Sequence, residues 1–263
     1  MNRRSVLLGG LAALCGVARP SGAGTARATG PLTVAAASDL QFALRPIAET
    51  FTTATGRPVR LVFGSSGILA SQLLRGAPFG VFLSADEALV FKLADAGLTV
   101  DRGRLYAIGR LGLFVPPGSP LRADGSLSDL RAVLQSGRLG KFSMANPEHA
   151  PYGARAREAL QHAGLWTAIQ PHLVLGENIT QAAQFAVAGR AHGGLVALSL
   201  MRSPALEGRG EFGLVPDTWH QPLRQRMVQM KTAPPVAAAF IDFLSTPAAR
   251  ASLARAGFQF PTP

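Results

Sequence analysis

The stretch Leu61–Asp86, LVFGSSGILASQLLRGAPFGVFLSAD, decides the fold of this chain. A β-rich run ends at the sequence GSSG of residues 64–67, and a helical pattern of apolar residues starts at once. The sequence GAP at 76–78 ends that helix, and the apolar run VFL at 81–83 predicts a second strand. The stretch therefore predicts a strand–helix–strand unit, with a glycine- and serine-rich turn at the carboxyl end of its first strand.

The turn at 64–67 has two interpretations. Unpaired N–H groups at a helix start favour negative charge, and two glycines with two hydroxyl side chains would let an anion approach the backbone closely. The simpler interpretation makes Ser65 or Ser66 an ordinary N-cap, because serine is favoured at that position. The turn alone does not decide between an anion site and a cap.

Strands and helices alternate along the rest of the chain. Leu32–Ala37 (LTVAAA) has the pattern of a buried strand and ends at the polar pair Ser38-Asp39. Further strands are predicted at 141–145, 173–175 and 194–198, and helices at 40–53, 127–135, 151–163, 179–188, 234–244 and 247–256. This alternation predicts an α/β fold with parallel sheets flanked by helices.

The run RLYAIGRLGLFVP at 104–116 is strand-like, contains two glycines and is followed by a Pro-Gly break. We interpret it as a crossover into a second lobe, because the alternation of strands and helices resumes after it. We predict lobe 1 at 29–107 plus 217–263 and lobe 2 at 108–216, with a ligand cleft between the two lobes.

Residues 1–28 have the pattern of a signal peptide. An arginine pair at 3–4 precedes an apolar stretch at 6–17, which is too short to span a bilayer. Small residues then offer cleavage after Ala23 or Ala28. The arginine pair partly matches a twin-arginine export signal, but such pairs also occur in ordinary Sec signals. We therefore expect an exported protein by either route.

Removal of residues 1–28 lowers the net charge from +11 to +7, because this segment holds four arginines and no acidic residue. The remaining arginines are scattered singly, without a basic run, and this argues against nucleic acid as a partner. Cys15 lies inside the apolar stretch, and we expect it to be removed with the signal peptide. The mature chain would then have neither a disulfide nor a thiolate metal site.

Enzyme motifs are missing or incomplete. The GSSG turn resembles a nucleophile elbow but lacks a glycine two places after Ser66. No G-x-x-x-x-G-K-[ST] sequence occurs, which argues against an NTP-binding P-loop, and the five histidines show no metal-ligand spacing. We expect no enzyme and no cofactor, with a secreted Ser-dependent hydrolase as the alternative from a different class.

Four strand-to-helix junctions carry small polar side chains or N-capping residues and no adjacent lysine or arginine. They are Ser38-Asp39, Ser65-Ser66-Gly67, the sequence NPEHAPYG at 146–153 and the sequence GENI at 176–179. Ligands of open parallel sheets bind beyond the carboxyl ends of the strands, so these helix starts are expected to face one cleft. A site of neutral N–H and O–H donors suits a fully ionised oxyanion held between closing lobes.

The chain resembles the periplasmic molybdate-binding proteins of ABC transporters. The matching stretches are AAASDL (35–40), FGSSGILASQLLRGAPFGVFLSAD (63–86), NPEHAPYG (146–153), ENITQAAQFAVAGRAHGGLVALS (177–199) and AFIDFLSTPAARASLARAGF (239–258). They are spread along essentially the whole mature chain, and the run from SSG to VFLSAD is highly specific. The resemblance implies a two-lobed periplasmic substrate-binding protein fold of type II, in which each lobe is a mostly parallel sheet flanked by helices.

The resemblance also implies the ligand and its contacts. Molybdate or tungstate would be held without counter-charge, so molybdenum would enter only as the centre of an oxyanion whose oxygens the protein contacts. Ser38 and Ser66 would supply hydroxyl and backbone N–H donors, and Tyr152 and Ile179 would supply backbone N–H groups at helix starts.

Two positions depart from the family pattern. One branch of the family also uses the residue after the first serine, which is Asp39 here. Its carboxylate either turns away, as an acid favoured by the dipole of the first turn, or faces the anion and accepts a proton from it. Other members place a tyrosine hydroxyl on the anion from the position of Ala197, so one donor is missing or is replaced, with Tyr152 as the candidate.

The resemblance implies a monomeric binding protein of the periplasm that delivers its oxyanion to the membrane permease of an ABC transporter. Asp39 keeps one alternative open, because a carboxylate would accept a hydrogen bond from protonated phosphate or arsenate. A binding protein that serves a sensor instead of a transporter is a further alternative.

Overall fold

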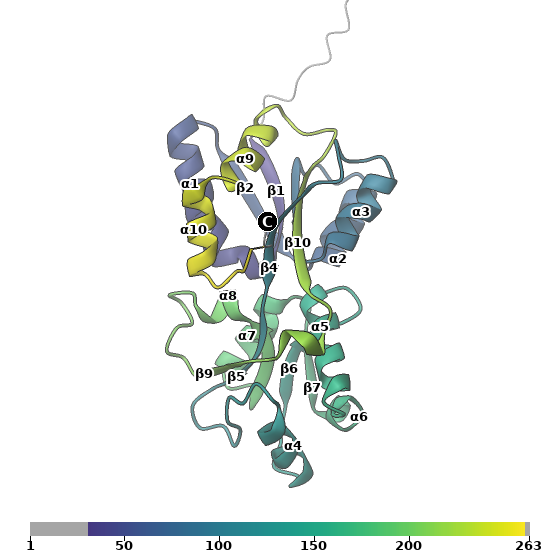
Figure 1. Cartoon of the computed structure of the whole chain (residues 1–263), viewed down its shortest axis with the longest axis vertical. Coiled ribbons are helices and arrows are strands. Elements are labelled where there is room, and N and C mark those ends of the chain that lie inside the picture. Colours follow the sequence, from purple (N-terminus) through teal and green to yellow (C-terminus); the bar gives the residue numbers. More distant parts are fainter. Residues whose placement is uncertain (1–30, 261–263) are drawn as a thin grey trace, which may run out of the picture.

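The computed structural model describes residues 31–260, which form two five-stranded sheets with helices packed on them (Figure 1). The signal peptide predicted at 1–28, with its cleavage sites and Cys15, lies outside the described residues. Within residues 31–260, no helix combines the length and the apolar character that crossing a membrane requires.

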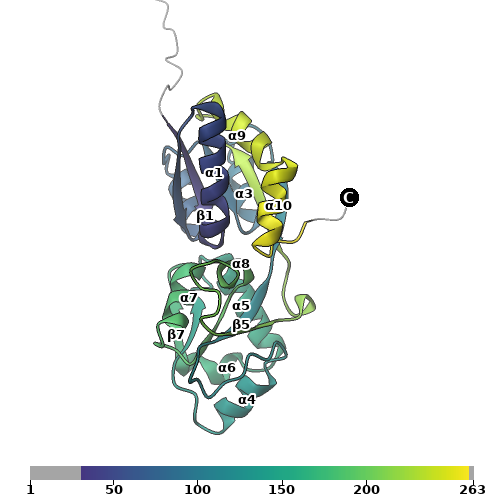
Figure 2. The same cartoon turned by 90° about the vertical axis from the view of Figure 1, so that its left-hand side faces the viewer.

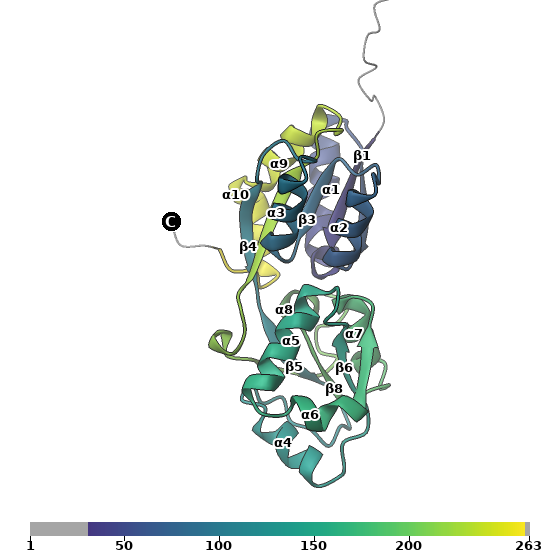
Figure 3. The ribbon, with the colours of Figure 1, turned by 90° about the vertical axis from the view of Figure 1, so that its right-hand side faces the viewer.

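The first sheet has the strand order β2-β1-β3-β10-β4. Its strands are β1 (Leu32–Ala37), β2 (Val59–Gly64), β3 (Val81–Ser84), β4 (Arg104–Gly109) and β10 (Leu223–Gln229). Its helices are η1 (Ser38–Leu40), α1 (Gln41–Thr55), α2 (Ser66–Leu74), α3 (Glu87–Asp95), α9 (Val236–Leu244) and α10 (Pro247–Arg255). The helices α1, α9 and α10 cover one face of this sheet, and α2 and α3 cover the other (Figures 2 and 3).

The second sheet has the strand order β7-β6-β8-β5-β9. Its strands are β5 (Leu111–Val115), β6 (Phe142–Ala145), β7 (Leu173–Gly176), β8 (Gly193–Ala197) and β9 (Glu211–Leu214). Its helices are α4 (Ser128–Gln135), α5 (Pro151–His162), α6 (Trp166–Ile169), η2 (Gln170–His172), α7 (Ile179–Val187) and α8 (Leu198–Met201), and η3 (Asp217–Trp219) lies on the return to the first sheet.

Apolar side chains of the helices and strands form the cores. Phe51 of α1 packs edge-on against Phe240 of α9, with ring centroids 5.1 Å apart. On the other face, Leu69 of α2 and Leu93 of α3 are buried against the strand residue Phe82. Both faces of the sheet are therefore covered, which explains why β1 and β3 read as continuous apolar runs.

Local signals set the ends of several helices. The side chain of Asp86 accepts a hydrogen bond of 2.9 Å from the Ala88 amide and caps α3. Asn178 caps α7 in the same way through the Gln181 amide, at 3.1 Å. Gly56, with φ of 66°, ends α1 in the left-handed conformation that favours glycine.

Half of the strand pairings in each sheet are antiparallel. In the first sheet β1 runs parallel to β2 and β3, whereas β10 runs antiparallel to β3 and β4. In the second sheet β6 is parallel to β7 and β8, and β5 is antiparallel to β8 and β9. The α/β fold class with mostly parallel sheets is confirmed, because four of the five strands in each sheet run in one direction and a single strand, β10 or β5, runs against them. β5 is the strand by which the chain enters the second sheet, and β10 is the strand by which it returns to the first.

The run 104–116 is divided between the two sheets. β4 ends at Gly109, β5 begins at Leu111, and Arg110 is the residue between them. The chain returns from β9 to β10 over residues 215–222. We propose that each sheet with its helices forms one lobe, close to the limits predicted from the sequence, and name them the first and second lobe.

Candidate functional site

A small pocket lies where the strand-to-helix junctions of the two lobes meet, and its empty volume is about 190 Å³. It is lined by Ala37, Ser38, Asp39, Gly64, Ser65, Ser66, Ala85, Ala150, Pro151, Tyr152 and Ile179. The structure therefore brings together all five predicted site residues, although they are spread over about 140 positions of the sequence. The pocket is small, so it suits a ligand of few atoms.

Parallel pairing explains the convergence within each lobe. β1, β2 and β3 end at the same edge of the first sheet, where Ser38, Ser66 and Ala85 follow them. β6 and β7 end at the facing edge of the second sheet, where α5 and α7 begin. Four separate helix starts therefore surround one pocket.

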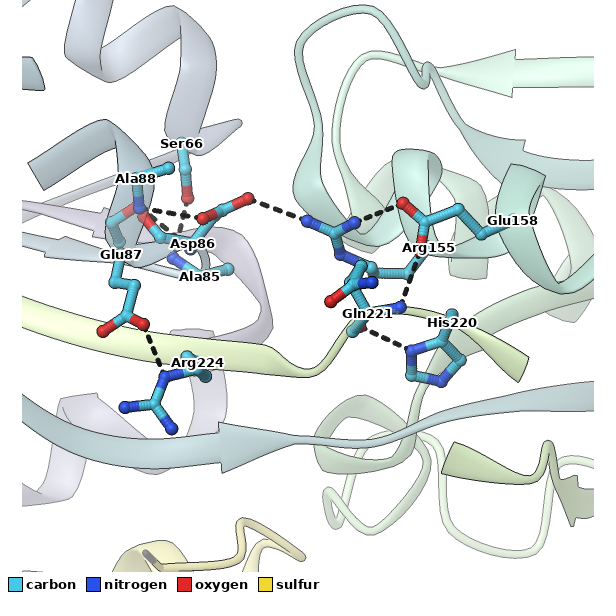
Figure 4. A network of polar contacts seen from close by, with 11 residues as sticks. Ser66, Ala85, Asp86, Glu87, Ala88, Arg155, Glu158, His220, Gln221 and Arg224 are labelled. Carbon is cyan, nitrogen blue, oxygen red and sulfur yellow. Dashed lines mark hydrogen bonds and ion pairs between the residues drawn. The ribbon is translucent and has the colours of Figure 1, made fainter. Parts of the chain in front are cut away.

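The hydroxyl of Ser66, which lines the pocket, accepts one hydrogen bond and donates none within residues 31–260. Its oxygen accepts a hydrogen bond of 3.0 Å from the backbone amide of Ala85 (Figure 4). This contact occupies a lone pair and leaves the hydroxyl proton free, while the side chain is buried at 1 % exposure. A buried hydroxyl that already accepts a bond can offer its proton to an anion without turning.

Backbone amides provide the donors of the second lobe. α5 begins at Pro151, which has no N–H, so the first amide of that helix belongs to Tyr152. In α7 the side-chain oxygen of Asn178 accepts its hydrogen bond from the Gln181 amide, so it does not accept one from the amide of Ile179. The first amides of a helix have no partner inside the helix and carry the positive end of its dipole.

Ser65 occupies the N-cap position of α2 but does not cap it. Its hydroxyl donates to the carbonyl oxygen of His149 in the second lobe, at 2.5 Å. The amide of Gly67 donates to the same carbonyl at 3.0 Å. Two hydrogen bonds thus connect the GSSG turn to the loop before α5. The sequence did not predict this contact, because His149 is distant from the turn in sequence.

Two more hydrogen bonds cross between the lobes beside the pocket. The Thr180 hydroxyl donates to the carbonyl of Ser38 at 2.9 Å, and the Ser199 hydroxyl donates to the carbonyl of Asp39 at 2.8 Å. These contacts fix η1 against α7 and α8. They orient the polypeptide that carries the two predicted site residues.

Asp39 belongs to a buried polar network. Its Oδ2 accepts from the Tyr152 hydroxyl at 3.0 Å and from Nε2 of Gln225 at 2.5 Å. The Tyr106 hydroxyl donates to Oε1 of the same Gln225 at 2.7 Å. Oδ1 of Asp39 is buried and has no hydrogen-bond partner among the described residues.

Burial raises the pKa of Asp39 to about 6, although its hydrogen bonds from Gln225 and Tyr152 lower it in part. Burial also raises the pKa of Tyr106 and Tyr152 well above that of an exposed tyrosine, and the charge of Asp39 adds to this. Both phenols therefore stay neutral, and Asp39 is the ionisable group of the pocket that titrates near neutral pH.

This network corrects one expectation. Tyr152 was the candidate to replace the missing family tyrosine, but its hydroxyl donates to Asp39. Ala197 ends β8, is fully buried and does not line the pocket. The role of Gln225 could not be found from the sequence, because β10 was not predicted and no motif marks a lone glutamine.

The rim carries ion pairs that bridge the lobes. Figure 4 shows the guanidinium of Arg155 between Asp86 of the first lobe and Glu158 of the second. Arg155 lies 3.0 Å from Asp86, and Glu158 also accepts the backbone N–H of Gln221 at 2.7 Å. Among the described residues that line the pocket itself there is no lysine or arginine. The guanidinium of Arg155 is thus paired with two carboxylates beside the pocket and is not among the residues that line it.

Features expected of a serine hydrolase are not assembled here. Ser66 has no hydrogen bond to a histidine within residues 31–260. Nδ1 of His149 lies 3.1 Å from the Ser65 oxygen, but that hydroxyl donates to the carbonyl of His149 itself. A nucleophile needs its proton directed toward a base, and the proton of Ser65 points to an amide oxygen instead.

Three comparisons with known proteins all find similarity to bacterial solute-binding proteins. The model of the bacterial extracellular solute-binding protein family matches residues 32–259. The molybdate-binding protein ModA of Rhodobacter capsulatus is 37% identical over 251 residues, which are 94% of this chain and 93% of that protein. ModA of Azotobacter vinelandii is 37% identical over 219 residues, which are 82% and 84% of the two chains.

Solved structures extend the likeness to the fold. The periplasmic molybdate-binding protein of Azotobacter vinelandii superposes with a TM-score of 0.79 at 30% identity, over 88% of this chain and all of that one. The sulfate-binding protein SubI of Mycobacterium tuberculosis, at 16% identity and a TM-score of 0.72, shares the fold over 89% of this chain and 88% of its own. The chain therefore belongs to the bacterial extracellular solute-binding protein family, in the branch that contains the ModA molybdate-binding proteins.

Proposed function

We propose that this chain is an exported binding protein that captures molybdate, and tungstate with it, between its two lobes and delivers the oxyanion to the permease of an ABC transporter. The ModA relatives support the ligand and the transport role. The observation that carries the proposal is the pocket in which Ser38, Ser66, Tyr152 and Ile179 present neutral donors from four helix starts, without a basic side chain.

The chemistry of these donors fits a compact dianion. Hydroxyl and amide hydrogens can each take one lone pair of an oxyanion, and helix dipoles add positive potential without a mobile counter-ion. The roles that we assign are hydroxyl and amide donation by Ser38 and Ser66, and amide donation by Tyr152 and Ile179. We further propose that the protein acts as a periplasmic monomer, without catalysis, without a cofactor and without a nucleic-acid partner.

Ser66→Ala tests the site directly. We expect molybdate affinity to fall by about 1–3 kcal/mol, since the bound anion would lose a donor inside a buried pocket. Ser71→Ala, which changes an exposed serine of the same helix α2, is the matched control and should bind as the parent does. Titration calorimetry of both variants measures the difference, and equal affinities would remove Ser66 from the site.

One observation favours a second candidate ligand. Asp39 lines the pocket, and an ionised carboxylate there would accept a hydrogen bond from singly protonated phosphate or arsenate. A thermal-shift panel of molybdate, tungstate, sulfate, phosphate and chromate separates the two candidates. Tight phosphate binding that is lost in Asp39→Asn would replace molybdate by a phosphate-type ligand.

A further inference from the structure

The carboxyl group of Asp39 has an oxygen without a partner in a pocket proposed for an anion. The side chain is 1 % exposed and lines the pocket, Oδ2 accepts two hydrogen bonds, and Oδ1 accepts none. An anion that enters this pocket meets a second negative charge if Asp39 is ionised. Two like charges in one desolvated site cannot both persist without strong repulsion.

No cation compensates Asp39. Within residues 31–260 its side chain takes part in no ion pair, and the side chains that donate hydrogen bonds to it, those of Tyr152 and Gln225, are neutral. Its own amide and that of Leu40 also favour the ionised form. The elements packed on η1, together with those that carry the hydrogen-bond network of Asp39, hold the following titratable or charged groups: Arg45 and Glu49 on α1, Arg60 on β2, Arg104 and Tyr106 on β4, Tyr152, Arg155, Arg157, Glu158 and His162 on α5, and Arg224 and Arg226 on β10.

Except for the tyrosines, these groups contact residues other than Asp39 or are exposed to solvent. Arg45 lies over the ring of Phe63, and Arg155 pairs with Asp86 and Glu158. Four further arginines form ion pairs: Arg224 and Arg226 with Glu87, Arg104 with Asp242, and Arg157 with Glu148. Glu49 and Arg60 are exposed to solvent. The helices α7 and α8 contain no charged residue. His162 stacks on Trp219. Within the described residues, an ionised Asp39 carboxylate is therefore stabilised by neutral hydrogen-bond donors and by no cation.

We propose that Asp39 binds the oxyanion as a neutral carboxylic acid, so that capture of each dianion is accompanied by uptake of one proton from solvent. Oδ1 is the oxygen that carries this proton, because Oδ2 is already occupied as the acceptor for Tyr152 and Gln225. The protonated Oδ1 then donates to an oxygen of the bound anion. Asp39 thereby becomes a specificity-determining residue, because it offers a hydrogen-bond donor to a fully ionised anion. It also makes the affinity for the anion depend on pH.

Burial prepares the group for this role. The pKa of Asp39 in the ligand-free pocket is already raised to about 6, and a bound dianion raises it further by repulsion. At pH 8 the free protein holds an ionised Asp39, and the complex holds a neutral one. The balance is complete with one proton from the medium, and no bond to the protein forms or breaks.

The inference rests on the proposed function and is tested with molybdate as the probe. Titration calorimetry at pH 8 in Hepes and in Tris, whose ionisation enthalpies differ, should show uptake of close to one proton by the parent protein. Between pH 7 and pH 9 its affinity should fall about tenfold for each pH unit, as expected when one proton is taken up per binding event.

Asp39→Asn keeps the shape of the side chain and supplies a permanent N–H donor. This variant should bind molybdate with an affinity that does not change between pH 7 and pH 9, and without proton uptake. Asp217→Asn, which changes an exposed acid of η3, should retain the slope of the parent. His149, whose ring contacts Ser65 at the pocket edge, is intact in both variants, so a slope that it carried would persist in Asp39→Asn.

The outcomes are distinct. Molybdate binding by the parent with neither a pH slope nor proton uptake overturns the inference and leaves the proposed function standing. A slope that persists in Asp39→Asn also overturns it, because another group would carry the proton. Failure of the parent to bind molybdate at any pH overturns the proposed function and the inference together.

Discussion

At the scale of single residues, hydrogen bonds from neighbouring groups hold two polar side chains of the pocket, those of Ser66 and Asp39. The Ala85 amide occupies the oxygen of Ser66, and Gln225 and Tyr152 occupy one oxygen of Asp39. Such contacts remove alternative rotamers before the ligand arrives. Preorganisation of this kind lowers the entropy that binding would otherwise lose.

Asp39 should destabilise the ligand-free protein at neutral pH. Its carboxyl is neutral in the folded and unfolded chain below pH about 4, and a penalty develops as the pH rises from there to the folded pKa of about 6. The free energy of unfolding therefore falls across this window by about 3 kcal/mol, since the folded pKa exceeds that of an unfolded aspartate by about two units.

Asp39→Asn should remove this penalty. Without ligand we expect the variant to be more stable than the parent by about 3 kcal/mol at pH 7.5, and the gain should vanish toward pH 3.5. Urea unfolding at the two pH values measures it. Asp217→Asn should show no such difference, and a pH-independent effect of Asp39→Asn would contradict a neutralised charge as its cause.

At the scale of elements, the start of α2 joins the lobes as well as lining the pocket. The Gly67 amide and the Ser65 hydroxyl both donate to the carbonyl of His149. A Cβ atom added to Gly67 would overlap that carbonyl oxygen. The glycine is thus required for the approach of the second lobe, and its φ lies outside the left-handed region.

Gly67→Ala should therefore bind molybdate more weakly while keeping its fold. Overpacking of about 1–3 kcal/mol against the closed arrangement corresponds to a loss of roughly 5–150-fold in affinity. Calorimetry gives the affinity, and thermal unfolding without ligand should show no matching loss, because alanine suits a helix better than glycine. Parent-like affinity would mean that the contact with His149 is dispensable.

The elements themselves were largely predictable where their signals are local. β1 begins and ends at the predicted residues, and Pro151 and Ile179 begin α5 and α7 as expected, because caps, prolines and glycines mark these ends. β9 and β10 were not predicted. The sequence of β10, LRQRMVQ, alternates polar and apolar residues and carries two arginines that pair with Glu87, so it lacks the apolar run of a central strand.

The site was predictable to the extent that it follows strand ends. Each of four predicted site residues lies directly after a recognisable strand or at a helix start: Ser38, Ser66, Tyr152 and Ile179. Parallel pairing then brings the strand ends to the same edge of each sheet. The partners of Asp39 depend on how α5, β4 and β10 are placed in space. No local pattern in the sequence encodes such a placement, so the network around Gln225 could be seen only in the structure.

At the scale of the whole molecule, a ligand that bridges two lobes should stabilise both. Molybdate at about 100 times its Kd should add about 2.7 kcal/mol to the free energy of unfolding. For a chain of this size that corresponds to a rise in Tm of roughly 5–11 °C. Differential scanning calorimetry measures the shift, sodium chloride at equal ionic strength is the control, and an equal shift with chloride would indicate nonspecific screening.

β10 lies between β3 and β4, and it is the last strand in sequence within residues 31–260. Until residue 229 has been added, β4 lacks its only strand neighbour in the part of the chain that the structure describes, and β3 has an open edge. The strands of the second sheet are complete by residue 214. Within residues 31–260 the first lobe is therefore started first and completed last during translation, so a nascent chain that stops short of β10 exposes an unpaired β-edge that invites aggregation.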